Sequence, residues 1–196
     1  MSDFDTVRIF EKRIAEFFGA PYAVATDSCT HAVEMCLRLV KADHVSCPTH
    51  TYLSIPMLAS KLGIGLQWRS ETWLEQYDLC YNIIDAATMF RKGSYVEGSL
   101  TCLSFQHQKH LSLGRGGMVL LYDRSHWFKV KLMSYDGRLP YTPWRKQDID
   151  TIGYHYYMTP ETAADGIRKL PEAIATPPRI WSSDDYPDLT KMKVFK

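Results

Sequence analysis

Residues 22–40 read YAVATDSCTHAVEMCLRLV, and this stretch points to a class of fold. Tyr22 to Ala25 is a short apolar run that is typical of a buried strand. Thr26 to Thr30 is rich in residues that cap helix N-termini, and apolar residues then recur at helical spacing from Val33 to Val40. The stretch therefore predicts a strand, a turn and a helix in succession.

The same alternation continues on both sides of this unit. Apolar runs predict further strands at His44 to Cys47, Gly63 to Trp68, Leu79 to Asp85, Leu100 to Phe105 and Gly117 to Tyr122. Helical spacing predicts helices over Val7 to Phe18, Ser54 to Leu62, Glu71 to Tyr77, Asp123 to Met133 and Pro160 to Leu170. Alternating strands and helices predict an α/β fold, a three-layer αβα arrangement with a mostly parallel sheet.

The composition excludes several classes of protein. The chain has 196 residues, 45% of them hydrophobic, which is globular and excludes a disordered chain. Lys and Arg number 23 against 22 Asp and Glu, so nucleic acid and anionic membranes are not expected partners. The five cysteines are odd in number and scattered along the chain, which is typical of reduced thiols and unlike a secreted disulfide framework. Without a signal-peptide pattern or a membrane-length apolar run, we expect a cytoplasmic protein.

The chain is expected to form one main domain. Residues 1–170 carry the alternating pattern of strands and helices. Residues 171–196 contain Pro177-Pro178 and the run from Ser182 to Asp185, which are too irregular for a second domain. They are expected to form an irregular C-terminal tail on the surface.

Polar residues follow three of the predicted strands, where an α/β sheet binds its ligands. Ser28, Cys29 and Thr30 stand at a predicted helix N-terminus, which either binds an anion such as phosphate or is simply capped. Asp85 ends a buried strand, where a carboxylate needs a cationic or hydrogen-bonding partner. Lys109 lies between two apolar strands, and a lysine out of water beside an acid and a phosphate site can bind an aldehyde cofactor.

A metal site is not expected. His44, Cys47 and His50 are spaced by three residues, which leaves zinc conceivable. No second pair of ligands follows at zinc-site spacing, so we predict no metal.

The order of several motifs resembles the DegT-like sugar-nucleotide aminotransferases, which are pyridoxal phosphate (PLP) enzymes of fold type I. The resemblance runs from about Phe10 to Leu170. The matching stretches are Phe10 to Gly19, Asp27 to Ala32, Pro48 to Tyr52, Ile84 to Ala87, Ser104 to Lys109 with Gly116-Gly117, and Gly153 to Met158 with Ala163-Ala164.

The resemblance implies a role for each matching residue. Lys109 would form the internal Schiff base with PLP and act as general acid and base, and Asp85 would pair with the pyridinium nitrogen. The remaining cofactor contacts would be Ser28, Thr30 and Ser104 at the phosphate, Tyr52 on the ring, and His155 at the phosphate across a homodimer interface. Four positions depart from the family pattern. Cys29 replaces a turn glycine, Thr88 replaces a glutamine or histidine near the phenolic oxygen, His155 replaces an asparagine, and Tyr157 replaces an arginine.

The implied function is transfer of an amino group from an amino acid, typically glutamate, to a nucleotide-linked keto-sugar for cell-surface glycan synthesis. Relative to the family, the middle section is short and the small C-terminal domain is missing or reduced. The sheet should accordingly have about six strands, with Gly117 to Tyr122 antiparallel. The alternative is a PLP-binding or sugar-nucleotide-binding protein without turnover, retained as a partner or regulatory subunit.

Overall fold

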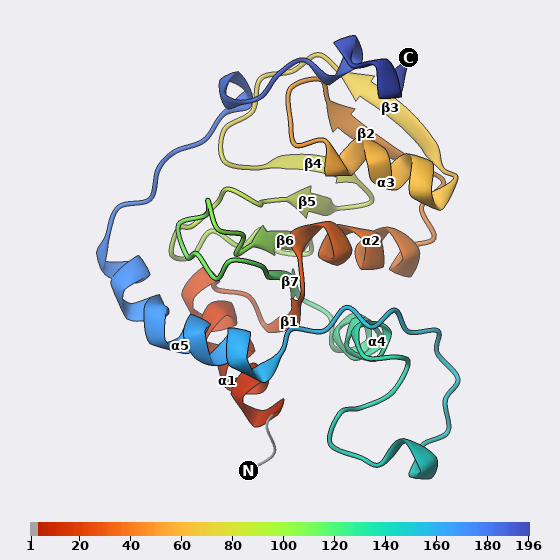
Figure 1. The fold of residues 1–196 in the computed structure, drawn as a ribbon, viewed down its shortest axis with the longest axis vertical. Coiled ribbons are helices and arrows are strands. Elements are labelled where there is room, and N and C mark those ends of the chain that lie inside the picture. The colour runs from red at the N-terminus through yellow and green to blue at the C-terminus, as the bar shows by residue number, and fades with distance from the viewer. Residues whose placement is uncertain (1–3) are drawn as a thin grey trace.

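The computed structural model describes residues 4–196, which form helices packed around a central sheet (Figure 1). The α-helices are α1 (Phe4–Phe18), α2 (Cys29–Leu39), α3 (Ser54–Leu62), α4 (Arg124–Ser134) and α5 (Pro160–Ala175). The strands are β1 (Tyr22–Thr26), β2 (His44–Pro48), β3 (Gly65–Arg69), β4 (Tyr77–Cys80), β5 (Ile83–Asp85), β6 (Leu100–Ser104) and β7 (Gly117–Leu121). The short 3-10 turns are η1 (Trp144–Lys146), η2 (Ser183–Asp185), η3 (Leu189–Lys191) and η4 (Lys193–Phe195).

The strands form a mixed sheet and a separate parallel pair. The main sheet has five strands in the order β1-β7-β6-β5-β4, and β2 pairs with β3. Within the main sheet only β5 and β6 are parallel neighbours. The expectation of a mostly parallel sheet of about six strands is therefore wrong. The antiparallel direction of β7 is confirmed by its pairing with β1 and β6.

A tight hairpin explains much of this difference. Strands β4 and β5 are joined through Tyr81 and Asn82, whose φ angles of 49° and 60° lie in the left-handed region that type I′ turns require. A two-residue turn can join only antiparallel strands, so the predicted single strand from Leu79 to Asp85 folds back on itself. The predicted helix from Glu71 to Tyr77 is also wrong, because Tyr77 begins β4 and its side chain is buried.

Two layers of helices cover the main sheet. On one face, Val24 and Val119 pack in a cluster with α2 and α4 residues such as Val33 and Val130. On the other face, Met118 and Leu120 pack in a cluster with residues of α1 and α5. The three-layer αβα arrangement is therefore observed, although the strand directions differ from the expectation.

The last part of the chain crosses the molecule. Helix α5 extends beyond the predicted end at Leu170 to Ala175, with Pro171 inside it. The C-terminal segment, residues 176–196, then runs from α5 to β2 and β3, where it ends (Figure 1). The Leu189 amide donates a 2.8 Å hydrogen bond to the Thr49 carbonyl, and the Leu189 side chain is buried. No helix within residues 4–196 combines the length and apolar character that crossing a membrane requires.

Candidate active site

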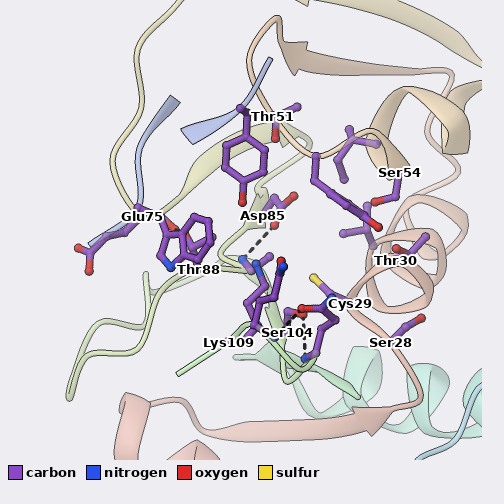
Figure 2. A pocket seen from close by; sticks show the side chains of 18 of the residues that line it. Ser28, Cys29, Thr30, Thr51, Ser54, Glu75, Asp85, Thr88, Ser104 and Lys109 are labelled. Atoms are coloured by element: carbon purple, nitrogen blue, oxygen red, sulfur yellow. Dashed lines mark hydrogen bonds between the residues drawn. The ribbon is translucent and has the colours of Figure 1, made fainter. Parts of the chain in front are cut away.

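A cavity of about 520 Å³ opens at one edge of the main sheet (Figure 2). Strands β1, β5 and β6 run in the same direction, so their carboxyl ends meet at this edge. The chain leaves β1 toward the N-terminus of α2, which also reaches the cavity. The predicted residues that line it are Ser28, Cys29, Thr30, Tyr52, Asp85, Thr88, Ser104 and Lys109. One cavity thus gathers every predicted site residue except His155.

Asp85 is held at the cavity by neutral hydrogen-bond donors. Its side chain is buried, its Oδ2 accepts a 2.5 Å hydrogen bond from the Tyr77 hydroxyl, and its Oδ1 accepts one from the Ala87 amide at 3.0 Å. Burial raises the pKa of Asp85, while Tyr77, Ala87 and the charge of Lys109 oppose that rise. Because both hydrogen-bond donors to the carboxylate are neutral, a cation bound in the cavity would stabilise its charged form.

Lys109 reaches the same cavity from the loop after β6. Its amide donates a 2.8 Å hydrogen bond to the Gln106 carbonyl, which fixes the turn that carries it. Burial lowers the pKa of Lys109, and the nearby Cys29 and Asp85 counteract only part of that effect. The ammonium is therefore easier to deprotonate than that of a solvated lysine, which favours a nucleophilic amine.

The N-terminus of α2 supplies an anion cradle beside these two groups. Ser28 is the N-cap residue, and its Oγ accepts a 3.2 Å hydrogen bond from the His31 amide. The helix approaches the sheet so closely that a Cβ on Gly117 would lie 2.4 Å from the Cys29 nitrogen. Unpaired amides at a helix N-terminus attract anions, and the Ser104 side chain lies nearby in the cavity (Figure 2).

The other predicted site residues have different environments. Burial raises the pKa of the Cys29 thiol well above its usual value, so the thiol is neutral. Thr88 donates its hydroxyl to the Glu75 carbonyl at 2.7 Å. Tyr52 lies at the rim and is 56% exposed. His155 lies outside the cavity, where its Nδ1 is 2.9 Å from Oδ2 of Asp136. The roles of these residues stay predictions.

The conceivable zinc ligands do not converge. His44 contacts Asp43, whereas His50 Nδ1 lies 2.9 Å from the Tyr186 carbonyl and Cys47 is buried. Within residues 4–196, no three or more His, Cys, Asp or Glu side chains form a group that could hold a metal ion.

Sequence reasoning missed several residues that line the cavity. Tyr77 anchors Asp85, and its hydroxyl oxygen lies 2.6 Å from the Thr51 hydroxyl. In the sequence of β4, the apolar residues Tyr77 and Leu79 flank the polar Asp78, and this alternation could have indicated a strand with Tyr77 facing inward. The C-terminal segment contributes further lining residues, and no periodic pattern in the sequence indicates them. These are Arg179, Trp181, Asp185 and Tyr186.

The motifs that reach this cavity recur in known proteins. The model of the DegT/DnrJ/EryC1/StrS aminotransferase family matches residues 1–67 and 90–176, which is most of the chain. The chain belongs to this family. The match includes Lys109, Ser104 and the N-terminus of α2, which confirms the family resemblance seen in the sequence. The match leaves out residues 68–89, which include Asp85. The family match therefore does not cover Asp85, and its place in the site rests on its position in the cavity.

A curated relative of this chain is a longer protein. It is 27% identical over 218 residues to GDP-perosamine synthase of Escherichia coli O157:H7, an alignment that covers 85% of this chain and 58% of that protein. The chain therefore spans little more than half the length of this curated relative.

Solved structures show the same fold. AtS13 from Actinomadura melliaura matches with a TM-score of 0.74 at 20% identity, over 87% of this chain and 60% of that one. The sugar aminotransferase CalS13 from Micromonospora echinospora matches with a TM-score of 0.71 at 14% identity, over 87% and 61%. At these identities the likeness establishes the α/β fold alone.

Proposed function

We propose that this chain binds PLP and forms the cofactor site of an aminotransferase that acts on nucleotide-linked keto-sugars. The observation that carries the proposal is that Lys109 and Asp85 line one cavity together with the N-terminus of α2. A lysine, a buried acid and an anion cradle are the three contacts that PLP needs from a protein. Membership of an aminotransferase family supports the same assignment.

The residues present fit the cofactor. When bound, PLP supplies an aldehyde carbon open to attack by a neutral amine and a pyridine ring that accepts electrons. Its protonated ring nitrogen is the cation that Asp85 lacks among its present partners. Ser28, Thr30, Ser104 and the first amides of α2 would hold the phosphate.

Lys109 is assigned two tasks in this proposal. Its lowered pKa gives it a larger neutral fraction than a solvated lysine has, so its Nζ can bond to the cofactor. In the reaction that the family resemblance implies, the neutral Nζ would accept a proton from the α-carbon of the amino donor and deliver it to the cofactor. Asp85, whose carboxylate is fixed by Tyr77 and Ala87, would keep the ring nitrogen of the cofactor protonated.

Several finer features belong to the same proposal. The donor is an amino acid, with glutamate expected from the family resemblance. A homodimer would let His155, whose side chain is 67% exposed, reach the phosphate site of the partner subunit. Residues 1–170 would act as the cofactor-binding domain, with 171–196 as the tail. A cytoplasmic location fits the five cysteines, which are all free thiols.

The second candidate is a PLP-binding or sugar-nucleotide-binding protein without turnover. Residues 68–89 lie outside the family match, and they contain both Asp85 and Thr88. If the local geometry of this segment departs from that of active relatives, the chain would hold the cofactor without completing amino transfer.

One experiment separates the two candidates. The protein is incubated with PLP and reduced with borohydride, and the labelled residue is identified by peptide mass. The aminotransferase and a PLP-binding protein without turnover both predict a pyridoxyl group on Lys109. The Lys109→Ala variant should lose this group, while Lys12→Ala, an exposed control in α1, should keep it. The unreduced protein is then mixed with glutamate and a panel of keto-sugar nucleotides. Amino transfer supports the enzyme, and labelling without transfer supports the PLP-binding protein. Absence of labelling at Lys109 refutes both of these and leaves the sugar-nucleotide-binding protein.

A further inference from the structure

A second cavity shares part of its wall with the active-site cavity. This outer cavity has a volume of about 340 Å³ and is lined by Thr88, Gln108, Lys109, His110, Arg179 and Trp181. All of these except His110 line the active-site cavity as well. Lys109 therefore lies where the two cavities adjoin. Arg179 and Trp181 belong to the C-terminal segment, which follows the last residue of the family match.

The indole of Trp181 contacts both cations. Lys109 Nζ lies 5.2 Å from the centre of the Trp181 ring, and Arg179 Cζ lies 4.0 Å from it. Such short distances to an aromatic face are typical of cation–π contacts, which are attractive for arginine and lysine alike. Arg179 and the proposed reacting amine of Lys109 therefore contact the same indole.

Arg179 is held in place but keeps free hydrogen-bonding capacity. Its Nη2 forms an ion pair with Asp185, while its side chain remains 63% exposed. A guanidinium has five N–H donors in a planar fork, so one carboxylate does not exhaust it. The remaining donors can bind a second anion at the mouth of the cavity.

Backbone hydrogen bonds fix the segment that carries Arg179. The Glu75 amide donates to the Trp181 carbonyl at 2.8 Å, and the Ser183 amide donates to the Trp73 carbonyl at 3.1 Å. His50 Nδ1 lies 2.9 Å from the Tyr186 carbonyl. The segment is therefore attached at Trp181 and at two points after it, and Arg179 lies two residues before the first of these attachments.

The charge of the outer cavity favours an anion. None of the described residues that line it is acidic, whereas Lys109 and Arg179 are basic. The acidic residues of the adjoining active-site cavity already have partners: Asp185 pairs with Arg179, Glu75 pairs with Arg91, and Asp85 accepts hydrogen bonds from Tyr77 and Ala87. An oxyanion entering from this side therefore meets two basic side chains and no acidic side chain among the described lining residues.

We propose that Arg179 binds an oxyanion of the substrate, a carboxylate or a phosphate, and thereby places the reacting group of the substrate beside Lys109. The assignment of Lys109 as the reacting amine rests on the proposed function. The anion site itself depends only on Arg179, Trp181 and the outer cavity.

The test measures binding of two probes by calorimetry on the full chain. Glutarate represents the carboxylate source and inorganic pyrophosphate represents the phosphate source. Arg179→Gln should weaken binding of at least one probe by roughly tenfold to hundredfold, the range expected for loss of a hydrogen bond to a charged group. The probe that responds identifies the source. Arg124→Gln, an exposed arginine at the start of α4 and outside both cavities, should bind both probes like the unmodified protein.

A second variant distinguishes binding from a purely structural role. Asp185→Asn removes the carboxylate that competes for Arg179, so it should tighten binding of the responsive probe. If Arg179 only anchors the segment through Asp185, then Arg179→Gln and Asp185→Asn should both weaken binding. Arg179→Lys keeps the charge without the planar fork and should give an intermediate loss. It serves as the readout if Arg179→Gln does not fold.

The outcomes also separate this proposal from the proposed function. Unchanged probe binding in Arg179→Gln, or no binding of either probe to the unmodified protein, overturns the anion site while borohydride labelling of Lys109 still stands. Loss of probe binding in Arg179→Gln without any PLP labelling supports the anion site and refutes the aminotransferase.

Discussion

The hydroxyl of Tyr77 donates a 2.5 Å hydrogen bond to Oδ2 of Asp85, and the two residues lie on opposite strands of one tight hairpin. The Tyr77 oxygen also lies 2.6 Å from the Thr51 hydroxyl, so the loop after β2 supports the same arrangement. With the Ala87 amide on the other oxygen, both carboxylate oxygens of Asp85 are bonded. The β4–β5 hairpin therefore orients the acid that faces Lys109.

Replacing Tyr77 with Phe should impair Asp85 without removing it. The Tyr77 hydrogen bond lowers the pKa of Asp85 against the effect of burial, so its loss should raise that pKa further. As pH falls, the carboxylate would then be protonated earlier, and the acidic limb of the kcat profile should move to higher pH. We expect kcat at neutral pH to fall by about tenfold, as for loss of a charged hydrogen bond. Tyr81→Phe is the matched control, because that exposed hydroxyl bonds Asp43 on the surface.

Lys109 should react with amine reagents at lower pH than a solvated lysine. Burial lowers its pKa, so its neutral fraction grows at pH values where exposed lysines are still protonated. Competitive acetylation across a pH series, read by peptide mass, gives the apparent pKa of each lysine. The same lysine in the urea-unfolded chain is the reference. Identical titration of Lys109 in folded and unfolded protein would contradict the burial argument.

The lowered pKa of Lys109 also has a consequence for stability. Below the pKa of the unfolded chain, the unfolded state takes up a proton more readily, so the lysine destabilises the fold. That destabilisation disappears as pH rises above 10.5, the usual value for lysine. Lys109→Met should therefore raise the free energy of unfolding at pH 7, and the difference should vanish at alkaline pH. A lower stability of the variant at pH 7 would show that the ammonium has a strong partner in the fold.

Gly117→Ala should disturb the phosphate cradle directly. The added methyl group would lie 2.4 Å from the Cys29 nitrogen and from the Ser28 carbonyl carbon, so the N-terminus of α2 must move. We expect a loss of about 1–3 kcal/mol in the free energy of unfolding, as for overpacking, together with weaker PLP binding. Gly65→Ala in β3 is the control, since its nearest neighbour is the His44 Cβ at 3.3 Å. Equal affinity for PLP in both variants would argue against the cradle.

Lys131→Ala should destabilise the fold through a site far from catalysis. Lys131 pairs with Glu11 between α4 and α1, their side chains are 10% and 7% exposed, and Glu11 also accepts the Ala25 amide at 2.8 Å. Removing one partner leaves a buried charge, which costs about 3–5 kcal/mol. Chemical denaturation measures the change. The exposed Lys12–Glu16 pair is the control, and Lys12→Ala should change stability by less than about 1 kcal/mol.

Some parts of the site could be predicted because local sequence specifies them. Ser28 caps α2 in the structure as its position before a helical pattern indicates, and Asp85 ends a buried strand. Lys109 follows the next strand, and parallel neighbours end at the same edge of a sheet. Strand-end positions and capping preferences are local properties, so the sequence locates these residues without knowledge of the whole fold.

Tertiary structure alone determined the rest. Whether residues 71–85 form a helix and a strand or a hairpin depends on burial of Tyr77 and Leu79 against distant strands, which a local pattern does not report. The C-terminal segment has no periodicity, yet long-range backbone hydrogen bonds at Glu75 and Thr49 bring Arg179 and Trp181 to the cavity. The sequence alone was thus enough to predict the alternating strands and helices, the family, and the pairing of Lys109 with Asp85. Strand direction and the wall of the cavity were decided by packing, because the contacts that select them join residues far apart in the chain.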